Sequence, residues 1–147
     1  PGPFDRVDGH ADYRGSNAAC TPLTPVTGAT VVPEQRVPVT FERQANGTFR
    51  TEVVLNPFRD EDYFGQGVCH WALVGLVADF HHGLVDFSPA IGLADSQSPR
   101  TVVKHFSNKS YAAADSARID IGADSPSAYK DPQATFAIRL RAEPVTR

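Results

Sequence analysis

The sequence predicts an all-β fold, an antiparallel β-sandwich of about seven strands with an immunoglobulin-like architecture. Apolar and polar residues alternate with period two in several segments, as expected for strands with one buried face. Helical patterns are weak, and twelve prolines and eleven glycines punctuate the 147-residue chain at strand-like intervals. Only the architecture is expected to be shared with immunoglobulin domains, because Trp71 follows the second cysteine instead of lying between the two.

The expected strands are short segments separated by turn residues. They are residues 37–41, 49–55, 68–80, 84–87, 101–106, 118–121 and 135–141. Asn46-Gly47 separates the first two and predicts a hairpin turn. His82-Gly83 predicts a second turn, and only residues 111–117 could form a short helix. The last strand has the clearest alternation of the seven.

Residues 68–80 differ from the other strands because both alternating faces are apolar. With strict period two, one face carries Cys69, Trp71, Leu73 and Val77, and the other carries Val68, Ala72, Val74, Leu76 and Phe80. Such a strand is central and covered on both sides, or it exposes one face to a partner. We expect Trp71 to belong to the core beside the disulfide described next.

Two cysteines, Cys20 and Cys69, favour a single disulfide if the protein is exported. The bond would close a loop of about 50 residues and stabilise the fold by on the order of 4 kcal/mol in the chain-entropy model. Two unrelated buried thiols are the alternative, and the spacing matches no zinc motif.

The length is that of one domain, so residues 1–147 are expected to fold as a single unit. Residues 1–30 are rich in Pro, Gly, Ser, Thr and Asn, and we expect them to be extended and to bury little surface. No segment is long and apolar enough to be a transmembrane helix. The net charge of −3 without a basic stripe argues against nucleic acid as a partner.

The start at Pro1 and the lack of methionine indicate a processed or trimmed chain. Removal of a signal peptide is one explanation, and truncation is the other.

The loop before the apolar run holds the first candidate site. Asp60, Glu61 and Asp62 are followed by Tyr63 and Phe64. These residues could form a solvated acidic turn, or the carboxylates could help to bind calcium, although the EF-hand pattern is absent. Alternatively the loop enters a cleft of a partner protein, because aromatic residues are favoured anchors and charge speeds encounter.

The second candidate site surrounds the predicted turn at His82. Asp79, His81, His82 and Asp86 are residue types that bind transition metals. Adjacent strand residues point to opposite faces, so His81 and His82 would not share one ion unless the turn brought them together. The alternative is a set of polar turn residues. Asp8, His10 and Asp12 form a similar set, which we expect to lie in the loose N-terminal segment.

Nucleophilic catalysis finds little support in the sequence. The Gly-X-Ser-X-Gly motif and glycine-rich phosphate loops are absent, and paired cysteines would not be free nucleophiles. The sequence therefore favours a non-enzymatic protein without a cofactor.

The run Asp62-Tyr-Phe-Gly-Gln-Gly-Val-Cys-His-Trp71 resembles a segment of small exported proteins of proteobacteria, the immunity proteins encoded beside type VI secretion effectors. The resemblance implies a periplasmic or secreted bacterial protein, often lipid-anchored upstream of residue 1, that neutralises a toxin by occluding its active site. It implies no individual inhibitory residue.

Three functional hypotheses follow. The first is an exported binding protein that inhibits a secreted toxin or hydrolase through residues 60–64. The second is an exported ligand- or metal-binding domain, or a hydrolase acting on cell-envelope sugar or peptide, through Asp79, His81, His82 and Asp86. The third is a structural subunit of an envelope assembly that self-associates through the second apolar face of residues 68–80.

Overall fold

A computed structural model describes residues 3–20, 33–55, 58, 60–63, 65, 67–94 and 98–145 of the chain. Strands hold far more of these residues than helices do, which confirms the all-β class. Among them, no helix is long and apolar enough to cross a membrane. Cys20 and Cys69 lie at disulfide distance, with their Cα atoms 4.7 Å apart, as the sequence predicts.

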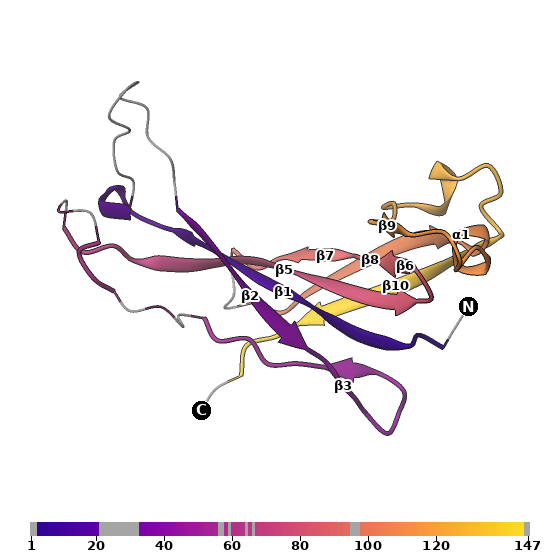
Figure 1. Cartoon of the computed structure of the whole chain (residues 1–147), viewed down its shortest axis with the longest axis horizontal. Helices are drawn as coiled ribbons and strands as arrows, with labels where there is room; N and C mark the ends of the chain where they lie inside the picture. Colours follow the sequence, from indigo (N-terminus) through magenta and orange to yellow (C-terminus); the bar gives the residue numbers. More distant parts are fainter. Residues whose placement is uncertain are drawn as a thin grey trace.

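The elements follow one another along the chain in the order of their numbers, and Figure 1 labels most of them. The strands are β1 (Arg6–Gly15), β2 (Glu34–Thr40), β3 (Glu42–Arg43), β4 (Phe49–Arg50), β5 (Trp71–His82), β6 (Val85–Phe87), β7 (Ala90–Gly92), β8 (Arg100–Ser107), β9 (Arg118–Asp120) and β10 (Thr135–Ala142). The helices are the α-helix α1 (Asn108–Ala112) and the 3₁₀ turns η1 (Ala18–Cys20) and η2 (Pro126–Ala128).

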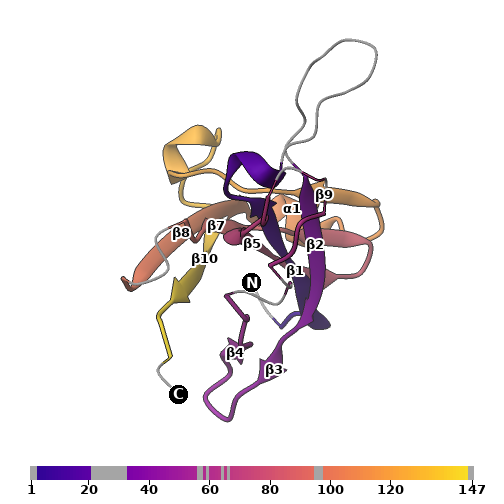
Figure 2. The same ribbon diagram turned by 90° about the vertical axis from the view of Figure 1, so that its left-hand side faces the viewer.

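Six of these strands form one mixed sheet. Its order is β2-β1-β5-β6-β9, and β7 also pairs with β5. β8 and β10 form a second, two-stranded antiparallel sheet, and β3 and β4 form a separate hairpin (Figures 1 and 2). The seven-stranded antiparallel sandwich is not confirmed in this form, because β6 and β9 are parallel. A parallel pair needs a long crossover, which β7, β8 and α1 supply here.

The main core lies between the large sheet and the β8–β10 pair. It contains buried residues from both layers, namely Val7, Leu76, Ala78, Phe80, Val85, Phe87, Ile91, Phe106, Ile138 and Leu140. Phe87 and Phe106 meet edge to face with ring centroids 5.3 Å apart. The buried positions of β10 are those predicted by its alternation. Close packing of the two layers is what holds the sheets face to face.

The N-terminal segment is the clearest correction to the sequence analysis. Residues 6–15 were expected to bury little, yet they form β1, which lies between β2 and β5. Its inward residues include Val7, Ala11 and Tyr13, all buried. Gly9 interrupts the apolar alternation of β1 in the sequence. The position requires glycine, because a Cβ there would overlap the carbonyl oxygen of Val77.

A β-bulge in β5 explains why residues 68–80 look apolar on both faces. Asp12 pairs with Gly75 while Tyr13 pairs with Leu73, so one residue of β5, Val74, is left without a partner on β1. The extra residue shifts the alternation of inward and outward side chains by one position. Leu73 and Leu76 are therefore both buried, while Val74 is exposed. The faces assigned by strict period two are wrong beyond this point.

Other expectations are met in part. The turn at Asn46-Gly47 joins β3 and β4, with Gly47 at φ 85°, and the turn at His82-Gly83 joins β5 and β6. The strand expected at 49–55 ends at Arg50, and β5 begins at Trp71 rather than Val68. The helix begins and ends earlier than expected, at 108–112. β9 exists, but Ile119 faces outward and is exposed.

Gly9→Ala tests the β1–β5 contact. The added methyl group must displace backbone atoms of Val77, so we expect the free energy of unfolding to fall by about 3 kcal/mol, at the upper end of overpacking costs. Chemical denaturation measures the change. Gly92→Ala is the matched control, because its methyl group would meet only the end of the Arg100 side chain. Equal effects of the two substitutions would contradict the close approach.

Candidate functional site

The disulfide lies at the base of the candidate loop and is reinforced by the residues that precede Cys20. Both cysteines are fully buried. The Asn17 side chain donates from Nδ2 to the Val68 carbonyl at 2.8 Å and accepts from the His70 amide through Oδ1 at 2.9 Å. The Ser16 amide donates to the His70 carbonyl at 2.8 Å. Residues 16–20 therefore clamp residues 68–70 both covalently and by hydrogen bonds.

The acidic residues of the loop are held in defined positions rather than dispersed in water. The Asp60 carboxylate contacts the His70 ring, with Oδ2 and Nδ1 3.1 Å apart. The carbonyl of Glu61 accepts from the Cys69 amide at 2.8 Å, and Oδ1 of Asp62 accepts from the Gly65 amide at 2.6 Å. All three acidic residues are nevertheless exposed. Residues 60–62 are thus held by specific contacts and remain accessible to a partner.

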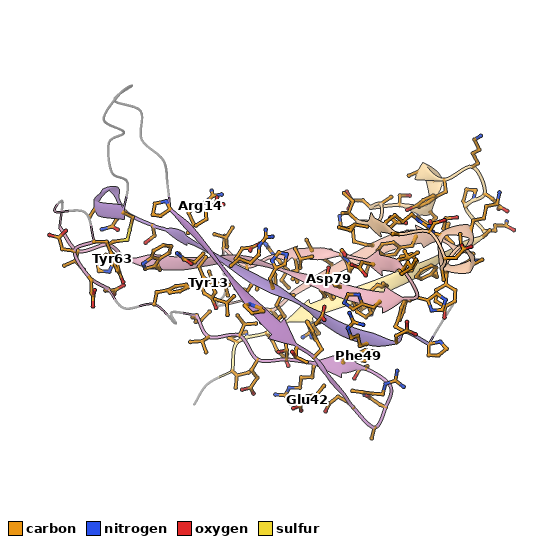
Figure 3. All side chains as sticks on the ribbon, viewed as in Figure 1. Tyr13, Arg14, Glu42, Phe49, Tyr63 and Asp79 are labelled. Atoms are coloured by element: carbon orange, nitrogen blue, oxygen red, sulfur yellow. A yellow bond between two sulfur atoms is a disulfide. The ribbon has the colours of Figure 1, made fainter. Side chains whose placement is uncertain are left out.

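A chain of aromatic rings connects this loop to the core. Tyr13 meets Phe58 edge to face at 5.2 Å, Phe58 contacts Trp71 at 5.1 Å, and Trp71 contacts Tyr63 at 6.4 Å between ring centroids. Figure 3 places Tyr63 at one end of the molecule and Tyr13 further in. Tyr63 remains 42% exposed. The ring is therefore fixed on one side and open to solvent on the other.

The structure describes four of the five residues predicted for partner binding, Asp60, Glu61, Asp62 and Tyr63, and Phe64 lies outside the described residues. Exposed apolar side chains flank them in the sequence. These are Val54, Leu55 and Val68. The Tyr13 hydroxyl donates to the Val54 carbonyl, which ties this flank to β1. We call residues 54–55, 60–63 and 68 the loop end of the molecule.

The second candidate site is built differently from the sequence expectation. His81 on β5 lies between Asp86 of β6, directly opposite in the register, and Asp8 of β1. Nδ1 of His81 is 2.6 Å from Asp86, and Nε2 is 2.6 Å from Asp8. Its side chain is only 12% exposed. With a carboxylate at each ring nitrogen, both nitrogens must donate, which makes His81 an imidazolium.

The same geometry determines how His81 titrates. Burial alone lowers the pKa of His81, but hydrogen bonds to Asp8 and Asp86, and the negative charges of both, outweigh it and raise the pKa above its ordinary value. The imidazolium is therefore stabilised by the fold, and the fold by the imidazolium.

The other predicted metal ligands do not join His81. His82 points to the opposite face, as adjacent strand residues do, and its ring stacks on Tyr111 with centroids 3.7 Å apart. Asp79 accepts a hydrogen bond from Ser88 at 2.6 Å instead. Within the described ranges no three His, Cys, Asp or Glu side chains are placed to hold a metal ion. Asp79 and His82 are therefore engaged in other contacts and do not meet at the His81 ring.

Two contributors were missed by the sequence analysis. Asp8 was assigned with His10 and Asp12 to a loose segment, whereas β1 brings it to His81, and His10 contacts Asp12 at 3.0 Å. No sequence pattern identifies Asn17. Its side chain hydrogen-bonds to the backbone of residues 68 and 70, and such a contact has no sequence motif. The alternation of Val7, Ala11 and Tyr13 across the glycine was the available clue to β1.

Comparison of the chain with protein-family models, with curated proteins and with solved structures finds no match. The function must therefore be argued from the two sites themselves.

Removal of the disulfide tests the base of the loop. Cys20→Ser with Cys69→Ser should lower the free energy of unfolding by about 4 kcal/mol, the value expected for a loop of this length in the chain-entropy model. Asn17→Ala keeps the disulfide, loses two hydrogen bonds and should cost about 1–2 kcal/mol. Denaturant melts measure both values. A larger loss from Asn17→Ala than from the cysteine pair would reverse this ranking.

The pH dependence of stability tests His81. Because its pKa is raised in the folded state, His81 contributes stability that is fully present below the unfolded pKa of 6.5 and is lost as pH rises through the folded pKa. His81→Gln should flatten this alkaline decline in the free energy of unfolding. His10→Gln, on the same strand face as Asp8, should keep the wild-type decline. An unchanged slope in His81→Gln would show that another group causes it.

Proposed function

We propose that this protein is a non-enzymatic, exported binding protein that inhibits a partner protein. More specifically, it acts as an immunity protein that neutralises a secreted bacterial toxin or hydrolase by occluding its active site. The observation that carries the proposal is the loop end, where exposed carboxylates and Tyr63 project from a backbone held by the disulfide and by the contact between Asp60 and His70.

Preorganisation is the physical reason why such a loop suits inhibition. Association costs conformational freedom, and residues 60–63, which already have defined contacts in the free protein, lose less of it on binding. The aromatic contacts that fix Tyr63 have the same effect on its side chain. Tyrosine is a frequent interface anchor, and acidic groups around it steer the loop towards a positively charged cleft. The proposed partner therefore has a basic active-site cleft.

The disulfide also supports the proposed location. Disulfides persist in oxidising compartments, so a bond between Cys20 of η1 and Cys69, which precedes β5, fits a periplasmic or secreted protein. A lipid anchor upstream of residue 1 belongs to the same proposal. The hydrolase alternative is weaker, because both ring nitrogens of His81 are occupied by carboxylates and none is left to act as a base.

One observation favours the structural-subunit alternative. Ile119 and Ile121 are 72% and 70% exposed, and Ile119 lies on β9, the last strand in the sheet order. Exposed apolar side chains on an edge strand promote association. The face differs from the one expected, since Leu76 and Phe80 are buried. Concentration-dependent light scattering that Ile119→Lys abolishes would favour this alternative over the inhibitor.

The inhibitor proposal is tested first by capture. The oxidised protein serves as bait in lysate of its native organism, and a stoichiometric toxin or hydrolase is the expected partner. Asp60→Ala, Asp62→Ala and Tyr63→Ala combined should then weaken binding by about 3 kcal/mol, or more than a hundredfold in Kd, because anchor and charges are lost together. Titration calorimetry measures the change.

Asp115→Ala with Asp131→Ala is the matched control, since both residues are exposed and lie in the segments around β9 and η2. This variant removes two negative charges without altering the loop end and should bind like wild type. Equal affinity of the loop variant and wild type would refute the loop as the binding surface. Inhibition of the captured enzyme by wild type is required as well, since binding without inhibition would contradict the proposal.

A further inference from the structure

A short segment at the N-terminus closes one end of the main core. Tyr111 donates its hydroxyl to the Pro3 carbonyl at 2.6 Å. The Phe4 ring packs edge to face on Phe80 at 5.3 Å and on Phe87 at 6.0 Å. We call residues 3–8 the N-terminal strap. It lies at the end of the molecule where α1 and β6 lie, away from the loop end (Figures 1 and 3).

The strap is held by the pairing of residues 6–8 with β5, by hydrogen bonds that Pro3, Phe4 and Val7 accept, and by a group of polar contacts at His81. The Asp5 amide donates to the His81 carbonyl at 2.7 Å, and Asp5 accepts from the Gly83 amide at 2.9 Å. Asp8, the last residue of the strap, accepts from the His81 ring. The His81 ring also binds Asp86 of β6. One imidazolium therefore ties the strap to both β5 and β6.

The charged groups around His81 make this contact dependent on its proton. Asp5 lies just before β1, and β1 supplies His10 and Arg6, whose Nε is 3.5 Å from Asp8. β3 adds Arg43, which lines one pocket with Asp5 and Asp8. β5 adds Asp79, which is opposite Asp8 in the register, and β6 adds Asp86. β9, which pairs with β6, adds Arg118 and Asp120, but the Arg118 guanidinium donates to the carbonyls of residues 110, 113 and 116. β2 places uncharged Thr40 opposite Asp8.

Loss of the proton from His81 turns one of its two attractive contacts with carboxylates into a repulsive one. A neutral ring donates through only one nitrogen, so the other presents a lone pair to a carboxylate oxygen 2.6 Å away. Asp8, Asp79 and Asp86 then lie together, and Arg6 beside Asp8 offsets part of their charge. Repulsion of this kind is relieved by movement of Asp8 and the residues before it, because the pairing of β1 with β5 ends at Arg6 and residues 3–5 belong to no strand.

We propose that His81 is a proton-dependent latch: its imidazolium holds the N-terminal strap over the aromatic end of the core, and deprotonation releases the strap. Release withdraws Phe4 from Phe80, Phe87 and Tyr111 and exposes an apolar surface at this end. The loop end is unaffected, because it is held by the disulfide and not by His81. The latch is independent of the proposed inhibitory function.

Hydrogen exchange of the intact, oxidised protein tests the latch. Protection factors, corrected for the chemical pH dependence of exchange, are measured by NMR from about pH 5.5 to about pH 9. We expect those of the Asp5 and Gly83 amides to fall severalfold over this range, following the His81 ring nitrogen shifts. The Cys69 and Ser16 amides should not follow them. Constant protection of Asp5 and Gly83, or an equal fall at Cys69, would overturn the proposal.

Three variants separate the proton from the side chain. His81→Arg keeps a cation with several donors and should hold the strap closed at every pH. His81→Gln cannot carry charge and should leave the strap poorly protected even at acid pH. His10→Gln, the matched control, should titrate like wild type. A wild-type titration in His81→Arg would overturn the latch, and so would a wild-type protein whose His81 ring titrates without any change at the strap.

Discussion

The pairing of β1 with β5 is the interaction on which the rest of the structure depends. β1 fills the position between β2 and β5, so it completes the large sheet and contributes Val7, Ala11 and Tyr13 to the core. Gly9 permits the two strands to approach, and the bulge opposite Asp12 and Tyr13 turns Leu73 and Leu76 to the same face. Both candidate sites begin on this strand pair.

The two ends of the β1–β5 pair are stabilised by different chemistry. At one end the disulfide and Asn17 hold residues 68–70 permanently, and the loop end is rigid at its base. At the other end the contact between Asp8 and His81 depends on a proton. A covalent bond is insensitive to pH, whereas a charge-assisted hydrogen bond is lost with its charge. One end is therefore suited to a fixed binding surface and the other to a reversible change.

Local signals predicted a substantial part of this arrangement. The cysteine count, the Asn46-Gly47 hairpin and the alternation of β10 depend on residues close in sequence or on simple pairing, and each is found. The acidic residues at 60–62 are exposed, as their sequence indicates, but the contact between Asp60 and His70 has no signal in the sequence. His81 and His82 lie on opposite faces of β5, as expected for neighbouring strand residues, and His82 stacks on Tyr111.

The sequence by itself determined the β class, the turns and the chemical character of both sites, because period-two alternation and turn residues act over a few positions. Only the tertiary structure decided that β1 is a strand, where β5 is bulged, that β9 runs parallel to β6, and that Asp8 meets His81. Each of these is set by contacts between segments far apart in the chain, such as the 73 positions that separate Asp8 from His81. No local pattern shows which distant strand a segment will pair with. Here that pairing places a glycine-containing segment between β2 and β5 in the sheet.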